Sequence, residues 1–241
     1  MKQIRLILGL ICIIYCLYSC STSNIERKDG NLVVYIEQGA EWEHDFPLFW
    51  GIKKRNSPQM AIWIEDTCGN YISTIYVTRR IAKQSWLMSK GNRRIEALPH
   101  WCHKHGIIYE DGLYSPTKES PLPDAVTGAT PRGSFAIGYS LKEKMSNYIV
   151  KLEVNHSTDF NDSYPKCARK EDSNYSGGEE GSGQPALIYY AKIDSTSHNE
   201  TIVAKLIGHS SPDGKDGNIY KDLSGITTAL NIIKSIKIKT R

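Results

Sequence analysis

Residues 60–78 read MAIWIEDTCGNYISTIYVT. Both ends of this stretch are rich in β-branched and aromatic residues, and side-chain character alternates with a period of two in its second half. Asp66-Thr-Cys-Gly-Asn70 lies between them and is a cluster of turn-forming residues. The pattern predicts a β-hairpin with strands over residues 60–65 and 71–78.

Runs of similar composition recur along the chain. They predict further strands over residues 31–37, 134–140, 147–154, 186–193, 201–207 and 232–239, and a short helix over 225–231. Short strands with little amphipathic helix predict an all-β sandwich, immunoglobulin-like or jelly-roll-like, with a barrel as the alternative. Residues 79–133 and 155–184 are predicted to be long loops, and long loops on a sandwich often carry the function.

Length and composition agree with one globular unit. The chain has 241 residues, of which 40% are hydrophobic and 23% are charged, and these values exclude a multi-span membrane protein, a collagen-like chain and general disorder. A chain of this length buries a core without help from metals or disulfides. We expect a single β-sandwich domain over residues 32–239.

The first 20 residues resemble the signal of a bacterial lipoprotein. Lys2 and Arg5 precede an apolar run over residues 6–18, which is shorter than the roughly 20 residues of a membrane span. Leu17-Tyr-Ser-Cys20 resembles a lipobox. The resemblance implies a signal peptide over 1–19, acyl chains such as palmitate on Cys20, a tether over 20–31, and a membrane-anchored protein facing the periplasm or cell exterior. An ordinary signal peptide and an uncleaved anchor are the alternatives.

Charge and cysteine content say little about partners. Removal of residues 1–19 takes away Lys2 and Arg5 and no acidic residue, so the formal net charge falls from +4 to +2. A nearly neutral chain gives no reason to expect a nucleic-acid partner. Cys68, Cys102 and Cys167 remain, and they allow one disulfide with the pairing left open.

A flavin-attachment motif stands out in the loop-rich region. Asp124-Ala-Val-Thr-Gly-Ala-Thr130 resembles the Asp-x-x-Ser/Thr-Gly-Ala-Thr motif of proteins that carry covalent FMN. In those families a flavin transferase joins FMN to the last threonine through a phosphodiester. The resemblance therefore implies FMN on Thr130, with Asp124, Thr127 and Gly128 around it and a flavin transferase as partner. The alternative is a type I turn over Thr130-Pro-Arg-Gly133, with proline second and glycine fourth.

Residues 100–105 contain four potential metal ligands. His100, Cys102, His103 and His105 offer nitrogen and sulfur atoms suited to zinc or copper. The chain has no second Cys/His pair at ligand spacing. These residues are therefore weak metal candidates, and a basic loop with incidental histidines is the favoured interpretation.

The order of several segments resembles a bacterial family of predicted periplasmic proteins of unknown function. The segments are residues 62–66, 71–78, 96–101, 124–130 and 183–189. Members are often encoded near flavin transferases and periplasmic electron-transfer proteins, which implies a link with extracytoplasmic redox systems.

The chain shows no coherent catalytic set. It lacks the Gly-x-Ser-x-Gly elbow of serine hydrolases, for example. The sequence therefore predicts a lipid-anchored binding or accessory protein, rather than an enzyme, with a protein or small-molecule ligand. An electron-transfer flavoprotein with FMN on Thr130 and a metal-binding protein using residues 100–105 are the alternatives.

Overall fold

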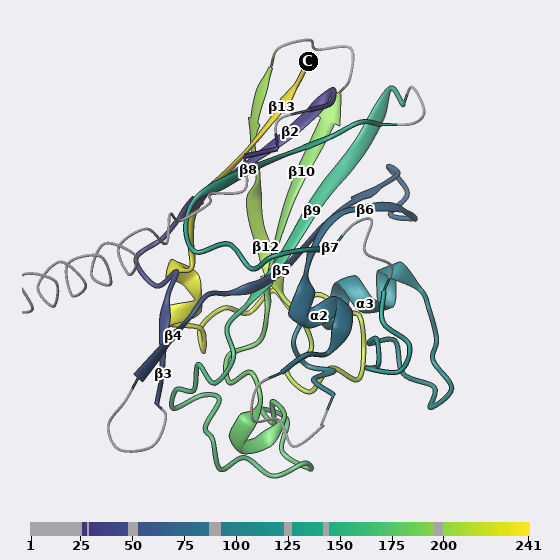
Figure 1. Cartoon of the computed structure of the whole chain (residues 1–241). Coiled ribbons are helices and arrows are strands. Elements are labelled where there is room, and N and C mark those ends of the chain that lie inside the picture. The colour runs from purple at the N-terminus through teal and green to yellow at the C-terminus, as the bar shows by residue number, and fades with distance from the viewer. Residues whose placement is uncertain are drawn as a thin grey trace, which may run out of the picture.

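The computed structural model describes residues 26–27, 29–47, 53–86, 93–122, 127–141, 145–194 and 200–241. Two β-sheets lie face to face at the centre, and two short helices cover the outer side of one of them (Figure 1). The predicted all-β sandwich with little helix is therefore confirmed.

The larger sheet has six strands in the order β12-β10-β9-β5-β6-β7. Its members are β5 (Gln59–Glu65), β6 (Tyr71–Thr78), β7 (Thr127–Gly128), β9 (Asn147–Asn155), β10 (Leu187–Asp194) and β12 (Lys205–His209). Strands β5 and β6 form the predicted hairpin, with Ala61 opposite Val77. Asp66 closes the turn, because its Oδ1 accepts the backbone N–H groups of Cys68 and Asn70.

The smaller sheet has five strands in the order β1-β8-β2-β13-β11. Its members are β1 (Glu26–Arg27), β2 (Leu32–Gln38), β8 (Phe135–Tyr139), β11 (Thr201–Val203) and β13 (Ile233–Thr240). Outside both sheets lie the hairpin of β3 (His44–Pro47) and β4 (Lys53–Asn56) and the 3-10 helices η2 (Gly178–Glu180) and η3 (Thr228–Asn231). The helix predicted over residues 225–231 is thus a 3-10 helix in its second half.

Alternate side chains of both sheets fill the space between them. Val34 and Ile36 of β2 join Ile62 and Ile64 of β5 in one buried cluster. This arrangement follows from the period of two along each strand, which turns every second residue toward the facing sheet.

The outer face of β5 is buried as well. Ala61 and Trp63 belong to a second hydrophobic cluster, which also contains Ile81 of α2 (Arg79–Lys83) and Trp101 of α3 (Pro99–His105). Residues 79–133, predicted to be long and loop-rich, therefore also contain two short helices. This segment adds a third layer against the six-stranded sheet, which explains why β5 is buried on both faces.

Helix α3 has local signals at both ends and a remote partner at its start. It begins at Pro99, which suits the first turn of a helix because proline lacks the N–H that would stay unbonded there. The Glu153 carboxylate accepts the backbone N–H groups of His100 and Trp101 at 3.2 and 2.7 Å. Gly106, at φ +78°, ends the helix.

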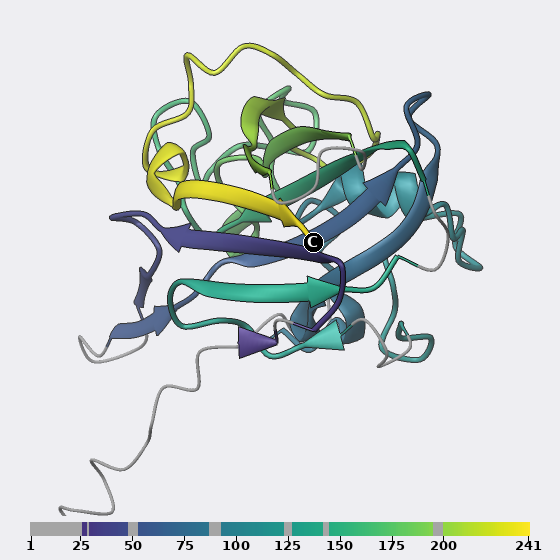
Figure 2. The same ribbon diagram turned by 90° about the horizontal axis from the view of Figure 1, so that it is seen from above.

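Two segments of the chain cross from one sheet to the other. Residues 201–207 were predicted to be one strand, but β11 pairs with β13 in the smaller sheet and β12 pairs with β10 in the larger sheet. In the same way, β7 pairs with β6 in the larger sheet, whereas β8, a few residues later, pairs with β2 in the smaller sheet. Both edges of the larger sheet are thus joined by the chain to the smaller sheet (Figure 2).

Candidate functional site

The four weak metal candidates, His100, Cys102, His103 and His105, all lie on α3 and contact different partners. The His103 ring lies 4.2 Å from the Tyr114 ring, and the His105 ring stacks 5.3 Å from the Trp101 ring. Cys102 is buried in the second hydrophobic cluster. In the described ranges, no group of three or more His, Cys, Asp or Glu side chains is placed to hold a metal ion.

His100 belongs instead to a buried network on the outer face of the six-stranded sheet. Its Nδ1 lies 2.6 Å from the Gly217 carbonyl, which can only accept, so Nδ1 carries the proton. Its Nε2 lies 3.2 Å from Lys151 Nζ and accepts from it. Burial, with the Lys151 ammonium adding to it, lowers the pKa of His100 to about 4. Lys151 Nζ also forms an ion pair with Glu65 Oε2 at 3.0 Å.

Glu153 gives the protein a pH-dependent stability. Burial raises the pKa of its carboxyl from 4.5 to about 8, despite the N–H groups of Trp101 and His100 that donate to it. Between these values the unfolded chain has lost a proton that the folded chain keeps, so stability falls as pH rises. From pH 6.5 to 8, Glu153 is therefore expected to lower the free energy of unfolding.

Urea unfolding of Glu153→Gln across this pH range measures that contribution. We expect the variant to be less stable overall, because it loses one acceptor at the start of α3, yet to lose less stability between pH 6.5 and 8 than the parent. Glu119→Gln, at an exposed position, is the control and should keep the parent's slope. Parallel pH profiles of Glu153→Gln and parent would contradict the assignment.

The flavin motif lies partly in the described chain. Thr127 and Gly128 pair with Val77 and Thr78 of β6, and Thr130 is half-buried. The flanking residues are anchored, since the Tyr76 hydroxyl donates to the carbonyl of Ala129 and Trp42 Nε1 donates to that of Pro131. Asp124 lies outside the described residues. Flavin attachment at Thr130 stays a prediction.

Two further expectations concern cysteines. Cys68, Cys102 and Cys167 are unpaired in the structure, with Cys68 and Cys167 exposed and Cys102 buried. Burial also raises the pKa of the Cys102 thiol far above its ordinary value. Cys20, the predicted lipid attachment point, lies outside the described residues.

No helix within the described ranges has the length and apolar character needed to cross a bilayer.

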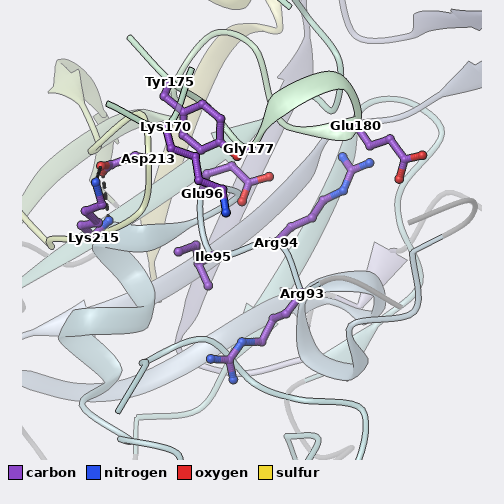
Figure 3. A pocket seen from close by; sticks show the side chains of 10 residues that line it. All are labelled: Arg93, Arg94, Ile95, Glu96, Lys170, Tyr175, Gly177, Glu180, Asp213 and Lys215. Carbon is purple, nitrogen blue, oxygen red and sulfur yellow. Dashed lines mark hydrogen bonds and ion pairs between the residues drawn. The ribbon is translucent and has the colours of Figure 1, made fainter. Parts of the chain in front are cut away.

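A cavity of about 480 Å³ is lined by candidate binding residues that the sequence did not indicate. It lies between residues 93–96, the loop over 170–180 and the segment 213–215 (Figure 3). Ten residues line it: Arg93, Arg94, Ile95, Glu96, Lys170, Tyr175, Gly177, Glu180, Asp213 and Lys215. Its size falls within the range of small-molecule binding sites, and its lining is mostly charged.

Arg94 is the most unusual of these residues. Its side chain is 7% exposed, and its Nε and Nη1 atoms are buried without a hydrogen-bond partner. The guanidinium lies 4.7 Å from the centre of the Trp86 ring, a cation–π contact. Burial lowers the pKa of Arg94, while the negative charges of Glu96 and Glu180 act in the opposite direction.

Glu96 faces the same cavity from two residues along the chain. It is 4% exposed, and burial raises the pKa of its carboxyl to about 7, while the positive charge of Arg94 lowers it. Arg94 and Glu96 both extend toward the segment of Gly177 and Glu180, whereas Arg93 turns away (Figure 3). A buried arginine and a buried carboxyl therefore share one cavity.

Glycines allow the walls of the cavity to approach each other. A Cβ on Gly177 would lie 2.4 Å from Glu96 Oε1, and a Cβ on Gly214 would lie 2.5 Å from the Ile95 carbonyl. Only a residue without a side chain permits these contacts.

Comparison with protein-family models, with curated proteins and with solved structures found no match to this chain.

Proposed function

We propose that this chain is a binding protein that holds a small molecule with an anionic group in the cavity beside Arg94. The observation that carries the proposal is the Arg94 guanidinium at the cavity wall, whose Nε and Nη1 have no hydrogen-bond partner. Buried charged donors without acceptors cost free energy, about 1–3 kcal/mol or more for each group. Carboxylate or phosphate oxygens would accept from them with strong, charge-assisted hydrogen bonds.

The lipoprotein-like N-terminus supports a place for this binding outside the cytoplasm. A lipid on Cys20 and the polar tether over residues 20–31 would hold the domain at a membrane surface. The ligand would then be a solute of the periplasm or the cell exterior.

Butyrate is a suitable first probe, and Trp86 is a built-in reporter because it contacts Arg94. We expect a saturable change of tryptophan fluorescence on titration of the full chain. Arg94→Gln should weaken butyrate binding by roughly tenfold or more, since a hydrogen bond to a charged group contributes about 1.5–3 kcal/mol.

The controls separate binding from folding. Arg79→Gln removes an exposed arginine that does not line the cavity, and it should bind butyrate like the parent. Urea unfolding of Arg94→Gln shows whether the variant is folded in the titration, because loss of the cation–π contact with Trp86 opposes the gain from removing unpartnered Nε and Nη1. The proposal fails if the parent shows no saturable change, or if Arg94→Gln binds as well as the parent.

A further inference from the structure

Resting on that proposed function, we infer that the ligand is a zwitterion of the amino-carboxylate class, with its carboxylate beside Arg94 and its ammonium group toward Glu96 and Glu180. Three features of the cavity support this inference: the charged residues that pair within the protein, the charged residues that do not, and the apolar surface between them.

Some of the lining charges are balanced within the protein. Lys215 Nζ forms an ion pair with Asp213 Oδ2 at 2.7 Å, and the Ser211 hydroxyl donates to Asp213 Oδ1. Arg93 pairs with Asp111 and donates to the Ser115 carbonyl. These groups are therefore not available as the main partners of a ligand.

Arg94, Glu96, Glu180 and the exposed Lys170 remain. Across the part of the chain that the structure describes, none of the four takes part in an ion pair, although Glu96 and Glu180 lie close enough to influence the pKa of Arg94. Arg94 and Glu96 are both more than nine-tenths buried. The Arg94 guanidinium therefore has two unpartnered nitrogens beside two carboxyls that form no ion pair.

A ligand with one charge satisfies only part of this arrangement. A simple anion would pair with Arg94 but would add negative charge near Glu96 and Glu180, which opposes binding. An ammonium group on the same molecule removes that repulsion and donates to the carboxyls. Ile95 and the half-buried Tyr175 supply apolar surface for the carbon chain between the two charges.

The protonation state of Glu96 should control the preference for the ammonium group. The other titratable groups at the cavity are Lys170, Tyr175, Glu180, Asp213 and Lys215, besides Arg94 and the outward-turned Arg93. Burial raises the pKa of Glu96 to about 7, so its carboxyl is mostly ionised at pH 8 and mostly protonated at pH 6. The attraction for a cationic group is therefore stronger at pH 8.

Three probes with the same carbon chain test the inference: 4-aminobutyrate, butyrate and butylamine. We titrate each into the full chain at pH 8 and pH 6, with tryptophan fluorescence as readout. At pH 8, 4-aminobutyrate should bind roughly tenfold or more tightly than butyrate, and this ratio should fall at pH 6. Glu96→Gln and Glu180→Gln should each reduce the ratio at pH 8, whereas Glu179→Gln, at an exposed neighbour that does not line the cavity, should not.

The outcomes distinguish the two proposals. Equal affinity for 4-aminobutyrate and butyrate, with both lost in Arg94→Gln, would overturn the zwitterion and leave the anion site standing. No saturable binding of any probe would overturn both. Tighter binding of butylamine than of the two carboxylates would also overturn both, because the site would then select a cation.

Discussion

Lys151→Met is expected to lower the free energy of unfolding by about 3–5 kcal/mol. The Lys151 and Glu65 side chains are 9% and 1% exposed, and their ion pair is 3.0 Å long. Without the ammonium, the Glu65 carboxylate would stay buried with the Trp63 Nε1–H, at 2.8 Å, as its remaining donor. His100 Nε2 would also lose its donor. Urea unfolding followed by far-ultraviolet circular dichroism measures the loss.

A double-mutant cycle shows whether the ion pair is the cause. Glu65→Gln should also destabilise the protein, because it leaves the Lys151 ammonium without its anion. The double variant should lose clearly less stability than the two single losses added together, since it removes both charges. Additive losses, or a loss below about 1 kcal/mol for Lys151→Met, would contradict the buried pair.

Gly214→Ala is expected to lower the free energy of unfolding by about 3 kcal/mol and to weaken butyrate binding. Gly214 has φ +74°, a conformation that disfavours alanine by about 1–2 kcal/mol. The new methyl group would also lie 2.5 Å from the backbone of Ile95. The segments carrying Asp213 and Glu96 would have to separate, and this changes the cavity between them.

Gly112→Ala is the matched control for that substitution. Gly112 has φ +79°, but nothing lies within 4 Å of a Cβ built there. It should therefore show the conformational cost alone, with butyrate affinity unchanged. If the two alanine variants were equally stable and bound butyrate equally well, the close approach of Gly214 to Ile95 would contribute neither to stability nor to butyrate binding.

The sandwich could be predicted because its strands are specified locally. Alternation from Tyr71 to Thr78 and the turn at Asp66 define the central hairpin without reference to the rest of the chain. The split of residues 201–209 between two sheets could not be predicted, because TIVAKLIGH has no break in composition. The point at which the chain leaves the smaller sheet depends on hydrogen bonds to a distant strand, because the Ala204 N–H donates to the carbonyl of Ile236 in β13.

Helix α3 shows why the third layer escaped prediction. It has seven residues and depends on Glu153, which lies more than 50 positions along the chain. Histidines that look like a ligand cluster in the sequence are separated by the helix and by contacts to Tyr114, Trp101 and Lys151. Short helices with remote caps leave little trace in local composition.

The cavity was missed for a similar reason. Arg93-Arg94-Ile95-Glu96 looks like a solvated charged stretch in the sequence. Arg94 and Glu96 become buried because Trp86, the loop with Gly177 and the segment with Gly214 converge on them from separate parts of the chain. Burial of this kind depends on tertiary structure, so a single sequence does not show it.

The most direct test of the anion site observes the Arg94 guanidinium itself. Its Nε–H signal can be recorded by ¹⁵N nuclear magnetic resonance and assigned by its absence from Arg94→Gln. The account predicts that addition of butyrate shifts this signal saturably, while the Nε–H signals of exposed arginines such as Arg79 stay in place. An unmoved Arg94 signal at butyrate concentrations that shift those of exposed arginines would contradict it.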